Sequence, residues 1–501
     1  MHGLINPRDL SLPGRIVVLL VLLLFWSGCR EETKQTPQQT EPPQARVGGC
    51  QGCHAGVDLD NHHTMSCDAC HGGDPQADSR DAAHVGLVGR PSQPQHAARA
   101  CGPCHQALVD ACSTSTHYSL PNEINQVRRH FGLPEVDGPQ DLQVSPGDDT
   151  LPALVDDLLR RHCLRCHVHD PGDAYPATRH GLGCAACHLE RGAGRQTSHR
   201  FLRHPGDRQC LACHRGAYVG AEYHGMAERD TTIEYRTPYA GPGAGRDFGI
   251  EQHRLGADVH QQAGIACIDC HGGAELMAAG AARPTPVSCR GCHDRRPGQP
   301  AAILPDGLSW SGSTLRLATK LSKRSLVVPQ LRHPAHARFA DTVDCAVCHA
   351  QRGGNDQTTH LLRQEGGDFS SWFEQTVQGN AEVERFLTRT EAGKKDAAAS
   401  RDKFTAEVRP GIWLQSYGQR RWEDIIIRPD QDGRLRVFRP LLDLRLSALD
   451  EAGRPLADNI TGQDDGYRPF TPHNIGPAGP FFVQRLRAGH TPKPGGKEST
   501  P

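Results

Sequence analysis

The chain repeats the pattern Cys-x-x-Cys-His nine times, and this repetition constrains its fold more than any other feature. The copies begin at Cys50, Cys67, Cys101, Cys163, Cys184, Cys210, Cys267, Cys289 and Cys345. Their second cysteines are Cys53, Cys70, Cys104, Cys166, Cys187, Cys213, Cys270, Cys292 and Cys348. The histidines that follow are His54, His71, His105, His167, His188, His214, His271, His293 and His349. Chance predicts roughly 0.05 copies in a chain of this composition, so the repetition reflects a function.

The spacing within each copy is typical of covalent attachment of haem c. On a helical turn, residues i and i+3 share a face, so both thiols can reach the two vinyl groups of one porphyrin. The next residue then supplies the proximal imidazole to the iron. Two other uses of paired cysteines, a zinc site and a redox dithiol, do not require a histidine after every copy. The sequence therefore predicts nine covalently bound haems.

Composition predicts a fold that depends on these cofactors. Only 37% of the residues are hydrophobic, and the 501 residues include 54 glycines and 37 prolines. Such a chain is poorly equipped to build large apolar cores by itself, and porphyrins would supply the missing apolar surface. We expect a multihaem cytochrome c fold, with mainly short α-helices and irregular loops wrapped around a haem array and a small β-containing C-terminal domain.

The N-terminus has the features of an export signal. Arg8 and Arg15 precede an apolar run at residues 16–26, which is too short to span a bilayer but fits a signal-peptide core. The following Ser27-Gly28-Cys29 resembles a bacterial lipobox, in which Cys29 would be lipidated, although Trp26 stands where a smaller aliphatic residue is usual. Ordinary secretion with a free thiol at Cys29 is the alternative. Residues 1–28 are therefore predicted to be a signal peptide.

Three further regions are predicted. Residues 29–47 are polar and proline-containing, which indicates a disordered, lipidated tether. Residues 48–366 hold all nine motifs and form the predicted haem domain. Residues 367–501 lack cysteine and are predicted to form a haem-free C-terminal domain, with a helix around residues 372–387 and strands within residues 412–449. This domain either caps the haem array or binds a partner.

Within the haem domain, short separations predict direct neighbours. We expect a pair from the first two motifs, a triplet from the fourth to sixth, and a pair from the seventh and eighth, with the third and ninth further away. A helix is predicted at residues 151–161, with Leu154, Val155, Leu158 and Leu159 on one face. Residues 236–249 and 295–307 are predicted loops. Cys112 has no partner motif; a buried thiol is expected, with a reactive thiol as the alternative.

The sixth iron ligand decides between electron transfer and catalysis, because a second histidine closes the iron and an open position admits substrate. Nineteen histidines of the mature chain lie outside the motifs, more than nine irons require. A single such histidine is more often a surface residue, but the population favours bis-histidine ligation. The distal candidates are His63, His96, His117, His180, His199, His204, His260, His336 and His473, with His62 beside the first of these.

The segment from His260 to His271 carries a family resemblance. A histidine precedes a Cys-x-Asp-Cys-His motif, as in the segment shared by pentahaem nitrite reductases, octahaem cytochromes and related tetrahaem carriers. Residues 48–366 as a whole resemble multihaem cytochrome c lipoproteins associated with metal or metalloid (selenite, tellurite) reduction and outer-membrane electron conduits. The chain has no Cys-x-x-Cys-Lys motif, so the lysine-ligated catalytic haem of the nitrite reductases is absent.

Two functions follow as hypotheses. The first is a non-catalytic electron carrier, attached to the cell envelope in the periplasm or at the outer membrane. Its partners would be a quinol-linked donor, other cytochromes and a porin conduit. The second is a terminal reductase of a small oxyanion (nitrite, tetrathionate or selenite) at one open haem. Nucleic acid is not an expected partner, because nine haems would make the near-neutral chain acidic by roughly ten to twenty charges.

Overall fold

The computed structural model describes residues 49–144, 150–167, 182–190, 198–211, 213–214, 228–229, 252–253, 257–277, 288–298, 306–351, 359–366, 399–402, 404–405, 407–417, 425–478 and 485–486. The chain divides into two units, residues 1–53 and 54–501. In the first unit only helix α2 (Gly49–Cys53) is described. The predicted signal peptide, Cys29 and tether lie outside the described residues. Among the described residues, no helix has both the length and the apolar character needed to cross a membrane.

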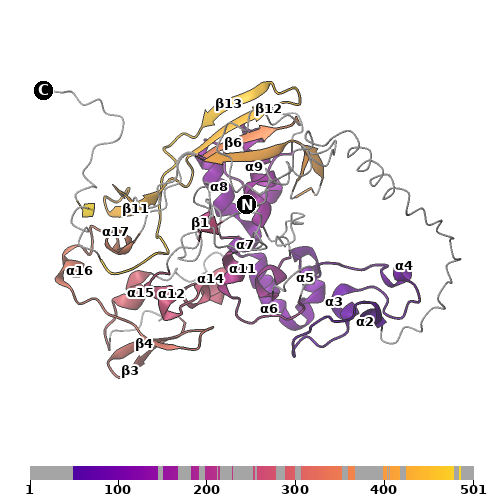
Figure 1. Ribbon diagram of the computed structural model, residues 1–501, viewed down its shortest axis with the longest axis horizontal. Coiled ribbons are helices and arrows are strands. Elements are labelled where there is room, and N and C mark those ends of the chain that lie inside the picture. The colour runs from indigo at the N-terminus through magenta and orange to yellow at the C-terminus, as the bar shows by residue number, and fades with distance from the viewer. Residues whose placement is uncertain are drawn as a thin grey trace, which may run out of the picture. The chain divides into compact units, whose positions relative to one another are not determined.

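The second unit contains short helices throughout (Figure 1). They are α3 (Cys67–His71), α4 (Arg80–Ala83), α5 (Pro94–Ala100), α6 (Gly102–Ser113), α7 (Thr116–Ser119), α8 (Pro121–His130), α9 (Leu151–Arg161), α10 (Ala185–His188), α11 (Asp207–Leu211), α12 (Val259–Ala263), α13 (Cys267–Cys270), α14 (Gly273–Leu276), α15 (Cys289–His293), α16 (Pro334–Arg338) and α17 (Cys345–His349). Two 3₁₀ helices are η1 (Pro139–Asp141) and η2 (Cys163–Cys166).

The strands form several small sheets. They are β1 (Glu228–Arg229), β2 (Gln252–His253), β3 (Leu308–Ser311), β4 (Thr314–Ala318), β5 (Ser325–Val327), β6 (Thr359–Gln364), β7 (Ala399–Arg401), β8 (Val408–Pro410), β9 (Ile412–Tyr417), β10 (Ile426–Pro429), β11 (Leu435–Arg439), β12 (Leu444–Leu449), β13 (Pro455–Thr461) and β14 (Arg468–Pro469). The described fold is therefore a mixture of helices and small sheets.

Helix formation begins at the motifs themselves. In α3, α13, α15 and α17 the first motif cysteine is the first helical residue. The residue before the helix caps two of them, because short polar side chains can accept hydrogen bonds from the free amides of the first turn. Ser288 accepts from the Gly291 amide and Asp344 from the Ala346 amide. Each turn thus presents cysteines i and i+3 on one face.

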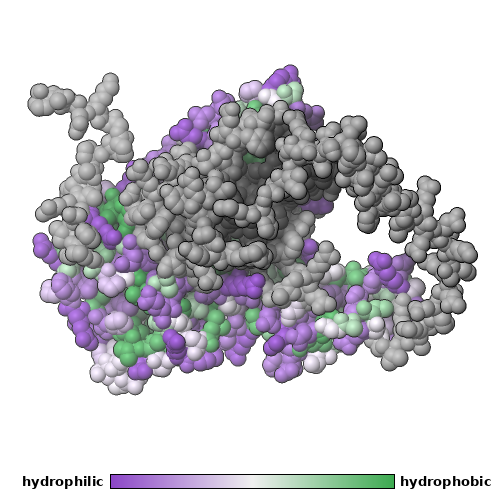
Figure 2. All heavy atoms as spheres, in the orientation of Figure 1, coloured by the Kyte–Doolittle hydropathy of each residue, from purple (hydrophilic) through white to green (hydrophobic). Residues whose placement is uncertain are grey.

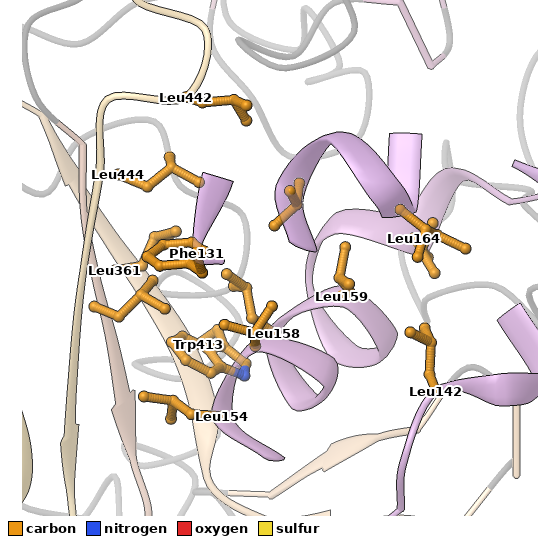
Figure 3. Packing of buried hydrophobic residues seen from close by; sticks show 14 of the residues in the cluster. Phe131, Leu142, Leu154, Leu158, Leu159, Leu164, Leu361, Trp413, Leu442 and Leu444 are labelled. Atoms are coloured by element: carbon orange, nitrogen blue, oxygen red, sulfur yellow. The ribbon is translucent and has the colours of Figure 1, made fainter. Parts of the chain in front are cut away.

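A conventional hydrophobic core forms between helices α8 and α9 and a four-stranded sheet in the order β13-β12-β6-β9. Strand β6 runs parallel to β12 and antiparallel to β9. Leu154, Leu158 and Leu159 of α9 pack with Trp413 and Leu361 of the sheet (Figure 3). All five side chains are almost fully buried. We call this helix–sheet packing the α9 core.

Two smaller sheets pack beside motif helices. The sheet β10-β11-β14 shares a cluster with α17, in which Ala346 and Val347 contact Ile427 and Val437. The sheet β3-β4-β5 buries Leu315, with Cys292 of the eighth motif packed against the same cluster. Both sheets bring apolar side chains to the motifs, so β structure supports the motifs as well as the C-terminal region.

Several local predictions are confirmed. Helix α9 has the predicted bounds, and its predicted apolar residues are buried. Strands β9 to β12 lie within residues 412–449, where strands were predicted. The predicted helix at 372–387 and loop at 236–249 lie outside the described residues, as does most of the loop at 295–307.

Two features differ from the sequence prediction. The sheet β3-β4-β5 is not among the predicted elements, because its strands are short and follow a Gly/Pro-rich stretch. Strand β6 precedes the predicted domain boundary at residue 366 but pairs with β9 and β12, which follow it. The sheet thus crosses that boundary, since strand pairing depends on register across the chain and not on where the cysteines stop.

Candidate haem iron ligands

Seven of the nine motif histidines face a histidine from outside the motifs. The ring centroids of each pair lie 6.0–6.4 Å apart. With the motif residue first, the pairs are His54–His84 (6.1 Å), His71–His199 (6.0 Å), His105–His63 (6.4 Å), His214–His117 (6.1 Å), His271–His473 (6.4 Å), His293–His260 (6.2 Å) and His349–His336 (6.1 Å).

This separation fits two imidazoles on opposite sides of one iron. A bond from an imidazole nitrogen to a transition metal is about 2 Å long, and the ring centre lies about 1 Å beyond that nitrogen, so the two centres should be roughly 6 Å apart. Aromatic rings that pack directly on one another have centroids about 4.5–7 Å apart, so it is the recurrence of nearly one distance at seven motif histidines that favours iron. The residues present therefore fit haem iron with two histidine ligands at seven sites.

The Nδ1 atoms of several motif histidines are held by hydrogen bonds, which would leave Nε2 for the metal. Backbone carbonyl oxygens accept from Nδ1 of motif histidines at 2.8–2.9 Å. These bonds are His71 to Val88, His188 to Leu202, His293 to Pro329 and His349 to Gly476. Such bonds fix the tautomer and the ring orientation that a haem ligand requires.

At two other sites a carboxylate, and not a backbone carbonyl, accepts the hydrogen bond from Nδ1. Asp60 accepts from Nδ1 of His63 at 2.8 Å, and Glu275 accepts from Nδ1 of His271 at 3.3 Å. Burial alone would raise the pKa of Asp60, but hydrogen bonds from the Phe201 and His62 amides and from His63 lower its pKa far below the usual range. Asp60 is therefore an anion, and an anionic acceptor increases the basicity of the imidazole that it orients.

The motif cysteines show which attachment sites are neighbours. The thiols of Cys210 and Cys267 are close enough to hydrogen-bond, as are those of Cys289 and Cys345. Cys70 lies near Cys101, and Cys270 near Cys292. The third and ninth motifs thus have close neighbours, which contradicts the prediction that they stand apart. Linear spacing could not reveal these contacts, because residues distant in sequence make them.

Cys112 contacts a motif cysteine. Its thiol is hydrogen-bonded to that of Cys184, the first cysteine of the fifth motif. This bond lowers the pKa of Cys112 to about 7, although burial acts in the opposite direction, and it raises the pKa of Cys184. The expectation of a plain buried thiol is therefore wrong, because Cys112 is half-buried and lies beside a thiol that haem attachment would use.

The fourth and fifth motif histidines are not among the seven pairs. His167 is almost fully buried, and its Nε2 donates to the Tyr118 carbonyl oxygen at 2.6 Å. The Phe404 ring lies 5.7 Å from the His167 ring. His188 has the Nδ1 bond to Leu202 described above. Among the predicted distal ligands, His96 and His204 lie outside the pairs, and His180 lies outside the described residues.

Sequence reasoning missed His84, which faces His54. The predictions favoured histidines shortly before a motif, whereas His84 follows the second motif and caps α4. A search for any histidine between two motifs would have found it. Another histidine, His130, has a structural role: it is buried in the α9 core and bonded to Asp464 at 2.8 Å.

Comparison with known proteins adds no relatives. No protein-family model, no curated protein and no solved structure matches the chain. Within the described part of the chain, no group of three or more His, Cys, Asp or Glu side chains is placed to hold a metal ion.

Proposed function

We propose that this chain is an exported multihaem c-type cytochrome that carries electrons between a respiratory donor and a further redox partner or an extracellular acceptor. The observation that carries the proposal is the set of seven motif-to-non-motif histidine pairs at 6.0–6.4 Å. Nine Cys-x-x-Cys-His motifs alone favour haem attachment, but the pairs also favour closed irons.

Haem c, when bound, supplies the one-electron iron chemistry, and the chain's own residues hold, close and tune each site. The motif thiols would hold the group covalently, and the paired imidazoles would exclude water and small ligands from the iron. Irons with a histidine on both sides would favour an electron carrier over the alternative, a reductase of a small oxyanion such as nitrite, tetrathionate or selenite. The resemblance to metal- and metalloid-reducing cytochromes remains part of this proposal.

Exposed apolar side chains near the motifs support cofactor binding. Met65, Val85, Leu87, Leu108 and Val259 are each at least 40% exposed, although they lie near motif or paired histidines. Figure 2 shows hydrophobic residues interrupting the hydrophilic surface around the motif helices. A porphyrin would cover such side chains, and each fully covered apolar side chain would stabilise the loaded protein by about 1.5–3 kcal/mol.

Neighbouring attachment sites support a path for electrons. Hydrogen-bonded thiols connect the sixth motif with the seventh and the eighth with the ninth, and nearby thiols connect the second with the third and the seventh with the eighth. A carrier requires such adjacency, because an electron must move from site to site. A catalytic centre would require only one site with access for substrate.

Intact-mass analysis tests this function. The full chain, matured in cells that attach haem c, should gain nine additions of about 616 Da each. The fully reduced protein should be mainly low-spin, because a histidine on each side closes at least seven irons. Seven or fewer additions would contradict the count of nine haems, and a high-spin haem that turns over nitrite, tetrathionate or selenite would contradict the carrier.

The envelope location is a separate part of the proposal. If Cys29 is the lipidated terminus, Cys29→Ser should move the protein from the membrane fraction to the soluble fraction while all nine haem additions remain. Fractionation followed by mass analysis would measure both. Cys112→Ser is the control for loss of a thiol and should remain with the membranes; equal membrane association of all three proteins would show that Cys29 is not the anchor.

A further inference from the structure

A four-residue segment near the C-terminus, residues 473–476, contacts three motif sites at once. His473 faces His271 of the seventh motif, with ring centroids 6.4 Å apart. Two residues later, the Ile475 amide donates to Asp258, and its carbonyl accepts from the Val259 amide. Asp258 and Val259 begin α12, the helix that carries His260 toward the eighth motif.

The ninth motif is held by the same segment. The Gly476 carbonyl accepts from Nδ1 of His349 at 2.9 Å, and the Gly476 amide donates to the His349 carbonyl at 2.9 Å. Asn474 is almost fully buried, and both its backbone oxygen and its side-chain oxygen accept from the Gln351 amide, at 2.9 and 3.0 Å. These bonds form a short antiparallel bridge between the segment and the residues that follow His349.

Space around Gly476 is limited. A Cβ atom there would lie 2.6 Å from Cδ of Gln351, so a side chain would displace Gln351 or the segment. The segment is held at the ninth site mainly by its hydrogen bonds, since the exposed Gln351 side chain can move aside. It also follows β14, whose partner β11 packs against α17 of the same motif.

We infer that residues 473–476 act as a clip that closes the seventh haem through His473 and couples it to the eighth and ninth sites. This inference rests on the proposed function. It gives the cysteine-free C-terminal region a role in the haem array: it supplies one iron ligand and orients the proximal histidine of another site. Asn474 is then a positioning residue, because its side-chain oxygen accepts from the Gln351 amide and so holds the clip at the ninth site.

The consequences differ for the two key residues. Loss of the His473 imidazole should open one iron, whereas loss of the Asn474 amide should loosen the clip at both ends. In the second case the ligand remains, but its distance to the seventh site and the hydrogen bond on His349 become variable. Second-sphere hydrogen bonds and ligand placement both change haem potentials, so two potentials should move together.

The test uses the full-length, haem-loaded protein and three variants, His473→Ala, His473→Met and Asn474→Ala. His473→Ala should keep nine haem additions and bind one more carbon monoxide per molecule than the parent. His473→Met should remain low-spin at that site and raise the potential of one haem, since methionine ligation raises haem potentials. Asn474→Ala should bind a fraction of one additional carbon monoxide and shift two midpoint potentials in a redox titration.

A matched control is His360→Ala. His360 lies in β6, bonds to Ser447 at 2.9 Å, and is not one of the paired histidines. This variant should bind carbon monoxide and titrate like the parent. The clip is overturned if His473→Ala gains no carbon monoxide binding, or if Asn474→Ala titrates like the parent while nine haems are present. A parent protein without covalent haem would instead overturn the proposed function.

Discussion

The α9 core and the motif helices are stabilised in different ways. In the α9 core, side chains from α9 and the sheet bury one another almost completely, and Trp413 donates to buried Asp157 at 2.8 Å. In contrast, α3, α12, α15 and α16 contain no buried residue, although they carry motif or paired histidines. The first region supplies its own core, and the second has the composition of a fold completed by a cofactor.

Charged groups show the same contrast. Arg160 donates to Asp402 at 2.7 Å, and both side chains are buried in the α9 core. A buried ion pair of this kind favours a single packing arrangement of the core. Removal of one partner destabilises the fold, because it leaves the other charge buried without that partner. Near the motifs, by comparison, carboxylates such as Asp60 and Glu275 orient histidines. Their contribution depends on the iron that those histidines are proposed to bind.

The largest effect is expected from removal of one attachment site. Cys267→Ala combined with Cys270→Ala should reduce the haem additions from nine to eight and destabilise the motif region by at least about 5 kcal/mol, because an empty porphyrin site leaves a large cavity. Intact mass and thermal unfolding monitored at haem wavelengths would measure both effects. Unfolding of the α9 core, monitored by far-UV circular dichroism, should change less.

A control for that variant is Cys112→Ser, which removes a thiol without removing an attachment site. It should keep nine additions. If the double variant unfolded at the temperature of the parent, the motif region would not depend on its cofactors and the contrast between the regions would be lost.

A second substitution tests the other region. Trp413→Ala should destabilise the α9 core by about 3–5 kcal/mol, since it removes a large buried side chain and leaves Asp157 without one donor. Haem additions should remain nine, because the motif cysteines are unchanged. Urea unfolding combined with intact mass measures this, and Leu456→Ala at a partly exposed position of β13 is the control. Loss of haem with Trp413→Ala would mean that the two regions fold as one.

The ion pair in the α9 core predicts a pH dependence. Burial would raise the pKa of Asp402, but hydrogen bonds from the Thr405 amide, Arg160 and the Phe404 amide lower it overall. A carboxyl group with a lowered pKa stabilises the fold above its unfolded pKa of about 4, and this stabilisation is lost as the pH falls through the folded value.

Asp402→Asn should therefore lower the free energy of unfolding by about 3 kcal/mol at pH 7, with a smaller difference from the parent in strong acid. Urea unfolding at a series of pH values would measure this. Asp432→Asn, at an exposed turn, is the control and should change stability by under about 0.5 kcal/mol. An equal loss at every pH would indicate a packing effect in place of the ion pair.

The structural features that could be predicted from the sequence differ between the α9 core and the motif region. Helix α9 was predictable because its leucines recur at helical spacing, and strand β12 because Leu444 and Leu446 alternate with polar neighbours. The motif cysteines and histidines needed only their local spacing. His84 and the thiol contact of Cys112 with Cys184 were not predictable, because both depend on which distant segments meet. The same holds for β6, whose partners follow it by many residues.

The smallest effect on stability is expected from substitution of Cys112. Its thiol is hydrogen-bonded to that of Cys184, so if the chain is exported as proposed, an oxidant outside the cytoplasm could convert the two thiols to a disulfide, with loss of two electrons and two protons. A disulfide there would withhold Cys184 from haem attachment. Cys112→Ser should change the free energy of unfolding by under about 1 kcal/mol, because the serine is similar in size.

The same substitution should increase the fraction of molecules with nine haems when haem supply is limiting. Intact-mass distributions of the parent and Cys112→Ser would show this as a smaller eight-haem peak. Ser113→Ala, at the exposed end of α6, is the matched control and should leave the distribution unchanged. Equal eight-haem peaks in the parent and Cys112→Ser would mean that the contact with Cys184 does not compete with haem attachment. Haem supply alone would then set the fraction of molecules with nine haems.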